Sequence, residues 1–246
     1  MIARSVTTST KGIILVHPHN PTGMFLRNYE YRKITEIAVK HGMAVISDEV
    51  FLDYPLGDTM DTMGTTAGTS DVLTFTLSGI SKTLGLPQLK LGWIVISGPE
   101  SLSAEAAGRL EILSDTYLSV NTPVQTALPE IMADCRIVRQ GIHERIKSNY
   151  IFIRGLLSGS TADTNYPCSV LEAEGGWYAI IRTPRTQTAE AWAMELLSGC
   201  NLYVYPGHFF DFEDDGFLVA SLLTEEETFR SSVRQIADFI SESVRK

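Results

Sequence analysis

The chain has 246 residues, of which 44% are hydrophobic and 20% charged, a composition that suits one large or two small globular domains and excludes a largely disordered protein. Its formal net charge of −9 argues against a nucleic-acid-binding protein and against a protein that adheres to anionic membranes. Three widely spaced cysteines and the lack of a long apolar run argue against a zinc site, a disulfide framework and a membrane span, so we expect a cytoplasmic protein without a metal site.

The first hundred residues alternate short apolar runs with amphipathic stretches. Strands are expected over residues 12–17, 43–47, 72–77 and 93–97, and a helix over residues 28–41, which ends near Gly42. Strands that alternate with helices are typical of an α/β layer with a largely parallel sheet.

The remainder of the chain changes from a helical pattern to a mixed one. Residues from about 99 to 157 are mainly helical in pattern, with an interruption near Asn121 and an end near Gly159. Beyond this section, strands are expected over residues 169–172, 177–181 and 217–223, and helices over residues 188–198 and 224–244, the last with a capping box that begins at Thr224. We therefore predict two domains, over residues 1–157 and 158–246, of which the second is a small α+β domain.

Three segments that follow expected strands carry polar residues, and ligands of open α/β sheets bind where the carboxyl ends of parallel strands converge. The first is Asn20-Pro21-Thr22-Gly23, whose asparagine amide can donate to an oxygen anion, with an ordinary turn as an equal alternative. The second is Asp48-Glu49-Val50-Phe51. Its aspartate can hold a ring nitrogen protonated, or it can simply cap the next helix.

The third segment, from Ser78 to Gly85, contains the most informative residue of the chain, Lys82. The apolar run before it would carry this lysine toward the interior, where it must neutralise, pair or react, and buried lysines serve as Schiff-base nucleophiles. Ser78 and Ser81 can offer hydroxyl groups to an anion, or they can equally bond to the local backbone. Together these features predict a carbonyl cofactor that bears a phosphate.

In this order, the three segments and Leu91-Gly92-Trp93 after them resemble the class I and II aminotransferases, which are fold-type I enzymes dependent on pyridoxal 5'-phosphate. The resemblance implies part of the large domain, with its mainly parallel sheet, followed by a small C-terminal domain in a homodimer. It implies that Asn20 bonds the phenolic oxygen of the cofactor, that Asp48 pairs with the pyridine nitrogen, and that Lys82 forms the Schiff base and moves the substrate proton. The implied substrates are an amino acid and a 2-oxo acid.

The chain departs from the family pattern at several positions. Phe51 stands where a tyrosine often touches the phenolic oxygen, and Lys90 stands where an arginine usually grips the phosphate. We expect Ser78, Ser81 and Lys90 to share the phosphate. The strand expected before the last helix contains no arginine for the substrate carboxylate, which leaves Arg182 or a partner subunit as the source, although a solvated charge is the favoured interpretation of Arg182.

Two further functions stay open at this point. The missing carboxylate arginine favours a lyase or decarboxylase of the same fold as an alternative. The family also has a long segment before the Asn20 turn that this chain lacks, so an inactive, truncated cofactor-fold fragment is the other alternative. Beside that turn, His17 is expected to be a satisfied loop histidine, and the acidic run Glu225 to Glu227 is expected to begin a helix rather than form a binding patch.

Overall fold

The computed structural model describes residues 2–117, 119–157 and 166–245. The chain divides into two compact units, the first formed by Met1–His19 and Met24–Gln140 and the second by Asn20–Gly23 and Gly141–Lys246. The domain boundary predicted at residue 157 lies inside the second unit, at the end of a helix, and it stays a prediction. The helix end predicted near Gly159 falls outside the described residues.

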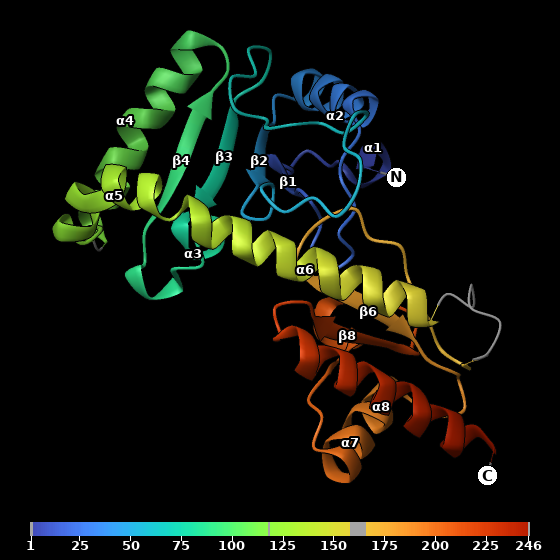
Figure 1. Ribbon diagram of the computed structural model, residues 1–246. Helices are drawn as coiled ribbons and strands as arrows, with labels where there is room; N and C mark the ends of the chain where they lie inside the picture. The colour runs from blue at the N-terminus through green and yellow to red at the C-terminus, as the bar shows by residue number, and fades with distance from the viewer. Residues whose placement is uncertain (1, 118, 158–165, 246) are drawn as a thin grey trace. The chain divides into compact units, whose positions relative to one another are not determined.

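The first unit is built on a four-stranded sheet in the order β1-β2-β3-β4 (Figure 1). The strands are β1 (Gly12–Val16), β2 (Ala44–Asp48), β3 (Thr74–Gly79) and β4 (Gly92–Ser97). β1, β2 and β3 run parallel and β4 runs antiparallel to β3, so the expected largely parallel sheet of an α/β layer is confirmed. The third strand begins two residues later than predicted, at Thr74, and Val72 before it is buried in the core that includes α2.

Helices flank this sheet, with α2 beside β2 and α4 beside β4 (Figure 1). They are α1 (Ile2–Ser5), α2 (Asn28–His41), α3 (Ile80–Thr83), the 3₁₀ turn η1 (Pro87–Leu89), α4 (Glu100–Thr116), α5 (Thr122–Asp134) and α6 (Arg136–Leu157), which continues into the second unit. α2 has the predicted bounds. It ends because Gly42 takes a left-handed conformation, φ 62°, and donates to the carbonyls of Ala38 and Val39.

The second unit contains an antiparallel four-stranded sheet in the order β5-β6-β8-β7. Its elements are β5 (Ser169–Val170), β6 (Tyr178–Arg182), α7 (Ala189–Cys200), β7 (Tyr205–Pro206), the 3₁₀ turn η2 (Gly207–Phe210), β8 (Phe217–Ser221) and α8 (Glu226–Arg245). Leu218 of β8, Trp192 of α7 and Ile240 of α8 are all buried in its core. The predicted small α+β unit is confirmed. Among the helices described in either unit, none combines the length and the apolar character needed to cross a membrane.

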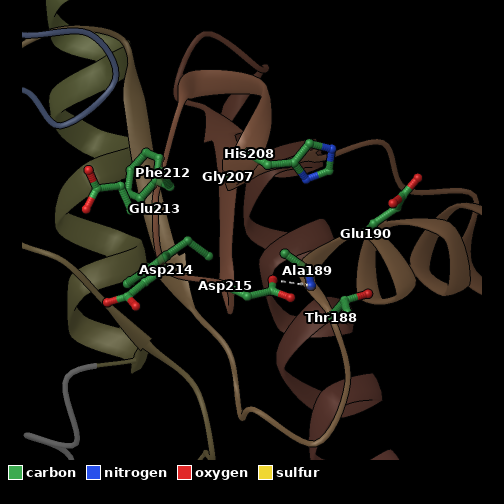
Figure 2. A pocket seen from close by; sticks show the side chains of 10 residues that line it. Thr188, Ala189, Glu190, Gly207, His208, Phe212, Glu213, Asp214 and Asp215 are labelled. Atoms are coloured by element: carbon green, nitrogen blue, oxygen red, sulfur yellow. Dashed lines mark hydrogen bonds between the residues drawn. The ribbon is translucent and has the colours of Figure 1, made fainter.

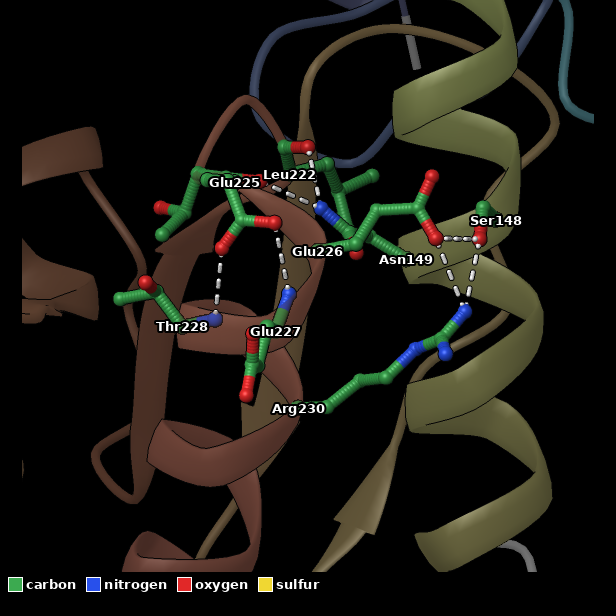
Figure 3. Close-up of polar contacts among 9 residues, drawn as sticks. Ser148, Asn149, Leu222, Glu225, Glu226, Glu227, Thr228 and Arg230 are labelled. Carbon is green, nitrogen blue, oxygen red and sulfur yellow. Dashed lines mark hydrogen bonds and ion pairs between the residues drawn. The ribbon is translucent and has the colours of Figure 1, made fainter.

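Polar contacts join α6 to the start of α8 in the second unit (Figure 3). Asn149 of α6 is fully buried, and its side-chain amide donates to the carbonyls of Leu222 at 2.9 Å and Thr224 at 2.8 Å. Glu226 accepts from Ser148 at 2.8 Å and from Arg230 at 2.9 Å. The amide of Asn149 thus saturates two carbonyls at the point where the chain leaves β8 in the core.

Glu225, rather than Thr224, caps α8. Its carboxylate accepts from the backbone N–H groups of Thr228 at 2.9 Å and Glu227 at 3.1 Å, which corrects the capping box predicted to begin at Thr224 (Figure 3). α8 begins at Glu226, so Glu225 is the residue directly before the helix and Thr224 lies one residue too early to cap it. The same two bonds lower the pKa of Glu225 from its ordinary value of 4.5, so the acidic run begins a helix as predicted.

Replacing Glu225 with alanine is expected to lower the melting temperature by about 2–4 °C near pH 7, since the first turn of α8 loses its cap. The folded-state pKa lies below the unfolded one, so this stabilisation is present above pH 4.5 and is lost as pH falls through the folded value. Thermal unfolding of both proteins between pH 3 and pH 7 measures the effect. Glu227→Ala is the control, because it removes a carboxylate from the same turn but leaves both capping bonds of Glu225 in place. An equal fall in melting temperature in that variant would contradict the capping role.

Candidate active site

Asp48 and Lys82 lie at one edge of the sheet in the first unit. Asp48 is the last residue of β2, in register with Val16 of β1 and Leu77 of β3. β3 ends two residues later at Gly79, and Lys82 follows in the single turn of α3. Because β1, β2 and β3 are parallel, their carboxyl ends form a common edge, where open α/β sheets bind ligands.

The side chain of Asp48 is half-buried, and only one of its two carboxylate oxygens accepts a hydrogen bond from a described residue. Its Oδ1 accepts from the N–H of Val50 at 3.1 Å, whereas Oδ2 makes no hydrogen bond to any described residue. Residues 50–53 form turns, so the alternative that Asp48 caps a following helix is wrong. Asp48 therefore offers a carboxylate oxygen at the edge of the sheet.

The side chain of Lys82 is partly buried and faces Phe51. The amine nitrogen lies 5.9 Å from the centre of the Phe51 ring, within the range of a cation–π contact. Two residues chosen from different sequence segments are thus brought together. Phe51 has no hydroxyl, so the amine meets the face of an apolar ring at this point.

Glu49, next to Asp48, has a different role, which the sequence analysis missed. Side chains alternate along a strand, and Glu49 is turned to the other face, where it is buried to 4% exposure. Its carboxylate accepts from the N–H of Thr66 at 2.8 Å and from the hydroxyls of Thr66 at 2.7 Å, Thr65 at 2.6 Å and Ser47 at 3.1 Å. Glu49 therefore anchors the loop at residues 65–66 behind the strand that ends at Asp48.

The three residues predicted to hold a phosphate lie around the start of α3. Ser78 is the next-to-last residue of β3 and Ser81 is in α3. Both are partly buried, and neither hydroxyl bonds to another residue within the described ranges. Lys90 is exposed and stands just before Leu91, whose carbonyl accepts from the N–H of Ile80 at 3.2 Å. These observations go against the alternative that the hydroxyls serve the local backbone.

Asn20 belongs to the second unit, unlike Asp48 and Lys82. Gly23, in the same turn, has a φ of 71° and packs against the backbone of Gly175 in the second unit. A Cβ at this position would lie 2.3 Å from the carbonyl oxygen of Gly175. A glycine is therefore required there. Asn20 itself is exposed, and its part in a site with Asp48 stays a prediction.

Two other residues lie where the sequence predicts, Arg182 at the surface and His17 in a loop. Arg182 is exposed at the end of β6, with its guanidinium carbon 5.6 Å from the centre of the Phe217 ring. His17 is buried, its Nδ1 accepts from the N–H of Leu26 at 3.0 Å, and its Nε2 lies 2.7 Å from the carbonyl of Met63. Both ring nitrogens are occupied, so His17 is a satisfied histidine, as expected.

The second unit has a cavity of about 270 Å³ beside the start of α7, rimmed by acidic residues (Figure 2). Asp215 at this cavity accepts from the N–H groups of Ala189 and Gly216, both at 2.7 Å, and these bonds lower its pKa. Its carboxylate is thus a helix cap. No cluster of histidine, cysteine or acidic side chains suited to a metal ion occurs within the described ranges.

Comparison with known proteins identifies a family. The family model described as "Aminotransferase class I and II" matches residues 2–233. Among curated proteins, glutamate-pyruvate aminotransferase AlaA of Escherichia coli is 32% identical over 127 residues, which are 52% of this chain and 31% of AlaA. The putative aminotransferase YugH of Bacillus subtilis is 24% identical over 241 residues, which are 96% of this chain and 58% of YugH.

Solved structures share the fold. The aromatic aminotransferase of Pyrococcus horikoshii has a TM-score of 0.80 at 21% identity and is matched over 98% of this chain and 63% of its own. The alanine aminotransferase of Pyrococcus furiosus has a TM-score of 0.83 at 22% identity, over 98% of this chain and 60% of its own. This chain spans less than two thirds of the length of each of these four proteins.

Proposed function

Since the chain belongs to the class I and II aminotransferase family, we propose that it transfers an amino group between an amino acid and a 2-oxo acid with pyridoxal 5'-phosphate as cofactor. The observation that carries the proposal is the placement of Asp48 and Lys82 at the carboxyl ends of neighbouring parallel strands. The name of AlaA makes glutamate and pyruvate the first substrates to test.

The donor groups at this edge fit the cofactor chemically. Lys82 offers an amine for its aldehyde, Asp48 an anion for its ring nitrogen, and Ser78, Ser81 and Lys90 offer hydroxyl and cationic groups for its phosphate. When bound, pyridoxal phosphate supplies an electron sink for negative charge at the substrate α-carbon.

The residues of the chain supply proton transfer and charge in this proposal. The Lys82 amine removes the proton from the substrate α-carbon and later returns a proton. The carboxylate of Asp48, whose Oδ1 accepts from the N–H of Val50, would offer its other oxygen to the ring nitrogen of the cofactor. Phe51 lines the space beside the amine, and Asn20 donates to an oxygen anion from its turn.

Trapping with borohydride tests the proposal. The chain is mixed with pyridoxal 5'-phosphate, reduced with borohydride, digested and mapped by mass spectrometry. The expected result is one phosphopyridoxyl group, on Lys82, together with alanine formation from glutamate and pyruvate. Modification spread evenly over Lys33, Lys90 and other lysines, or no modification of Lys82, would overturn the proposal.

Replacing Asp48 with asparagine is expected to slow amino-group transfer by about 10²–10³-fold, because a neutral amide no longer holds a positive charge at the ring nitrogen. The fold should persist, since the amide oxygen can still accept from Val50. Steady-state kinetics of the two proteins measures the loss. Asp53→Asn, which removes an exposed partner of Arg139 at 3.4 Å, is the matched control and should keep its activity.

The alternative functions have less support. The four similar proteins named above are all called aminotransferases, which does not favour a lyase or decarboxylase, and release of ammonia or carbon dioxide from the substrate would reveal either one. An inactive fragment would show no saturable binding of the cofactor. In this proposal the substrate carboxylate is bound by Arg182 or by a group of a partner subunit.

The proposal also covers location and assembly. We place the chain in the cytoplasm as a homodimer. Three free cysteines, Cys135, Cys168 and Cys200, support a reducing compartment. Exposed apolar side chains on the first sheet, among them Ile14 of β1 and Ile94 of β4, support association with another protein surface.

A further inference from the structure

We propose that Tyr54 is a positioning residue that fixes the backbone of Lys82, an inference that rests on the proposed function of Lys82. Tyr54 lies six residues after Asp48, in the turns that follow β2, and its side chain is 0% exposed. Its hydroxyl donates to the carbonyl oxygen of Lys82 at 2.6 Å and lies 3.2 Å from that of Thr83. The hydroxyl of Tyr54 thereby links the turns after β2 to α3, whose Lys82 and Thr83 are 28 and 29 residues further along the chain.

α3 needs such an external contact because it has only four residues. A helix of one turn leaves most of its carbonyls without a partner inside the helix. Ile80, Thr83 and Leu84 are buried and anchor its apolar side, but side-chain packing does not saturate the carbonyls at its end. The Tyr54 hydroxyl does this from a separate segment, and its bond to Lys82 is the shortest polar contact of that carbonyl.

The hydroxyl of Tyr54 is suited to be a permanent donor. Burial, with a smaller contribution from the charge of Asp53, raises the pKa of Tyr54 above its ordinary value, so the hydroxyl stays protonated at neutral pH. Removing this donor is costly, because the carbonyl of Lys82 then keeps only weaker contacts, among them the bond from the N–H of Gly85 at 3.3 Å.

The segment that carries Tyr54 also begins with Asp48. This segment is a compact series of turns. The N–H of Leu52 donates to the carbonyl of Glu49, and the N–H of Tyr54 donates to that of Phe51, both at 3.0 Å. One end of this series is Asp48 at the edge of β2, and the other end holds the backbone of Lys82. Tyr54 thus couples the position of the reacting amine to that of the carboxylate.

The test compares Tyr54→Phe with Tyr31→Phe in the full chain. Tyr31 is the matched control, because it is also a buried tyrosine of the first unit, and its hydroxyl bonds to that of Thr69 at 2.9 Å, away from α3. Both variants keep the ring and lose one buried hydrogen bond, so both should melt about 2–4 °C lower. A purely structural role of Tyr54 predicts no other difference between them.

Two measurements separate positioning from stability. In the chain without cofactor, acetic anhydride labelling is expected to modify Lys82, relative to exposed Lys33, about twofold or more faster in Tyr54→Phe only, because α3 opens locally. With pyridoxal 5'-phosphate, the borohydride-trapped adduct on Lys82 should form about tenfold more slowly in the same variant.

Equal labelling ratios in Tyr54→Phe and Tyr31→Phe would overturn the inference, even if both proteins were less stable than the wild type. Failure of the proposed function would look different, since the wild-type chain would then form no adduct on Lys82. The labelling ratio without cofactor decides the positioning role in that case as well.

Discussion

Replacing Lys82 with alanine is expected to abolish the phosphopyridoxyl adduct and to reduce amino-group transfer by at least about 10³-fold. The amine is the proposed nucleophile for the cofactor and the proposed base for the substrate proton, and no other lysine follows β3 within α3. Stability should change little, because the side chain is only partly buried and its cation–π contact with Phe51 is long at 5.9 Å. Adduct mapping and single-turnover kinetics with glutamate measure the effect.

Lys33→Ala is the control for this variant. Lys33 is exposed on α2 and lies 5.3 Å from the centre of the Tyr29 ring, so its removal also costs one cation–π contact. It should form the adduct and transfer amino groups at the wild-type rate. Persistence of the same covalent adduct in the Lys82 variant would exclude Lys82 as the reacting lysine.

Replacing Glu49 with alanine is expected to lower the free energy of unfolding by about 2–4 kcal/mol, the largest stability loss that we predict. The change leaves the buried N–H of Thr66 without its acceptor and opens a cavity where the carboxylate was. The hydroxyls of Ser47 and Thr65 lose the same partner. Denaturant unfolding monitored by circular dichroism measures the loss.

Glu49→Gln tests whether these bonds, rather than side-chain volume, cause the effect. The amide oxygen can still accept from Thr66, and the amide nitrogen can donate to the hydroxyl of Thr65, so a loss of only about 1 kcal/mol is expected. If glutamine and alanine destabilise the protein equally, the network around Glu49 does not stabilise the loop as described.

Some parts of the fold depend only on neighbouring residues and follow from the amino-acid sequence. The bounds of α2 follow from its amphipathic spacing and from Gly42, and the strands of the first sheet follow from short apolar runs. The residue types in three ordered segments were sufficient to nominate Asn20, Asp48 and Lys82. α3 was not predicted, because four residues are too few to show a helical period.

Contacts between side chains from distant segments arise only in the packed structure. Whether Glu49 or Asp48 faces the edge of the sheet depends on strand register, and the partner of the Lys82 carbonyl is a tyrosine 28 residues away. The structure also assigned Asn20 to a different unit from Asp48 and Lys82. A sequence pattern reflects the preferences of neighbouring residues. The pairings above form because each buried polar group needs a hydrogen-bond partner, and packing of the chain determines which partner lies within reach.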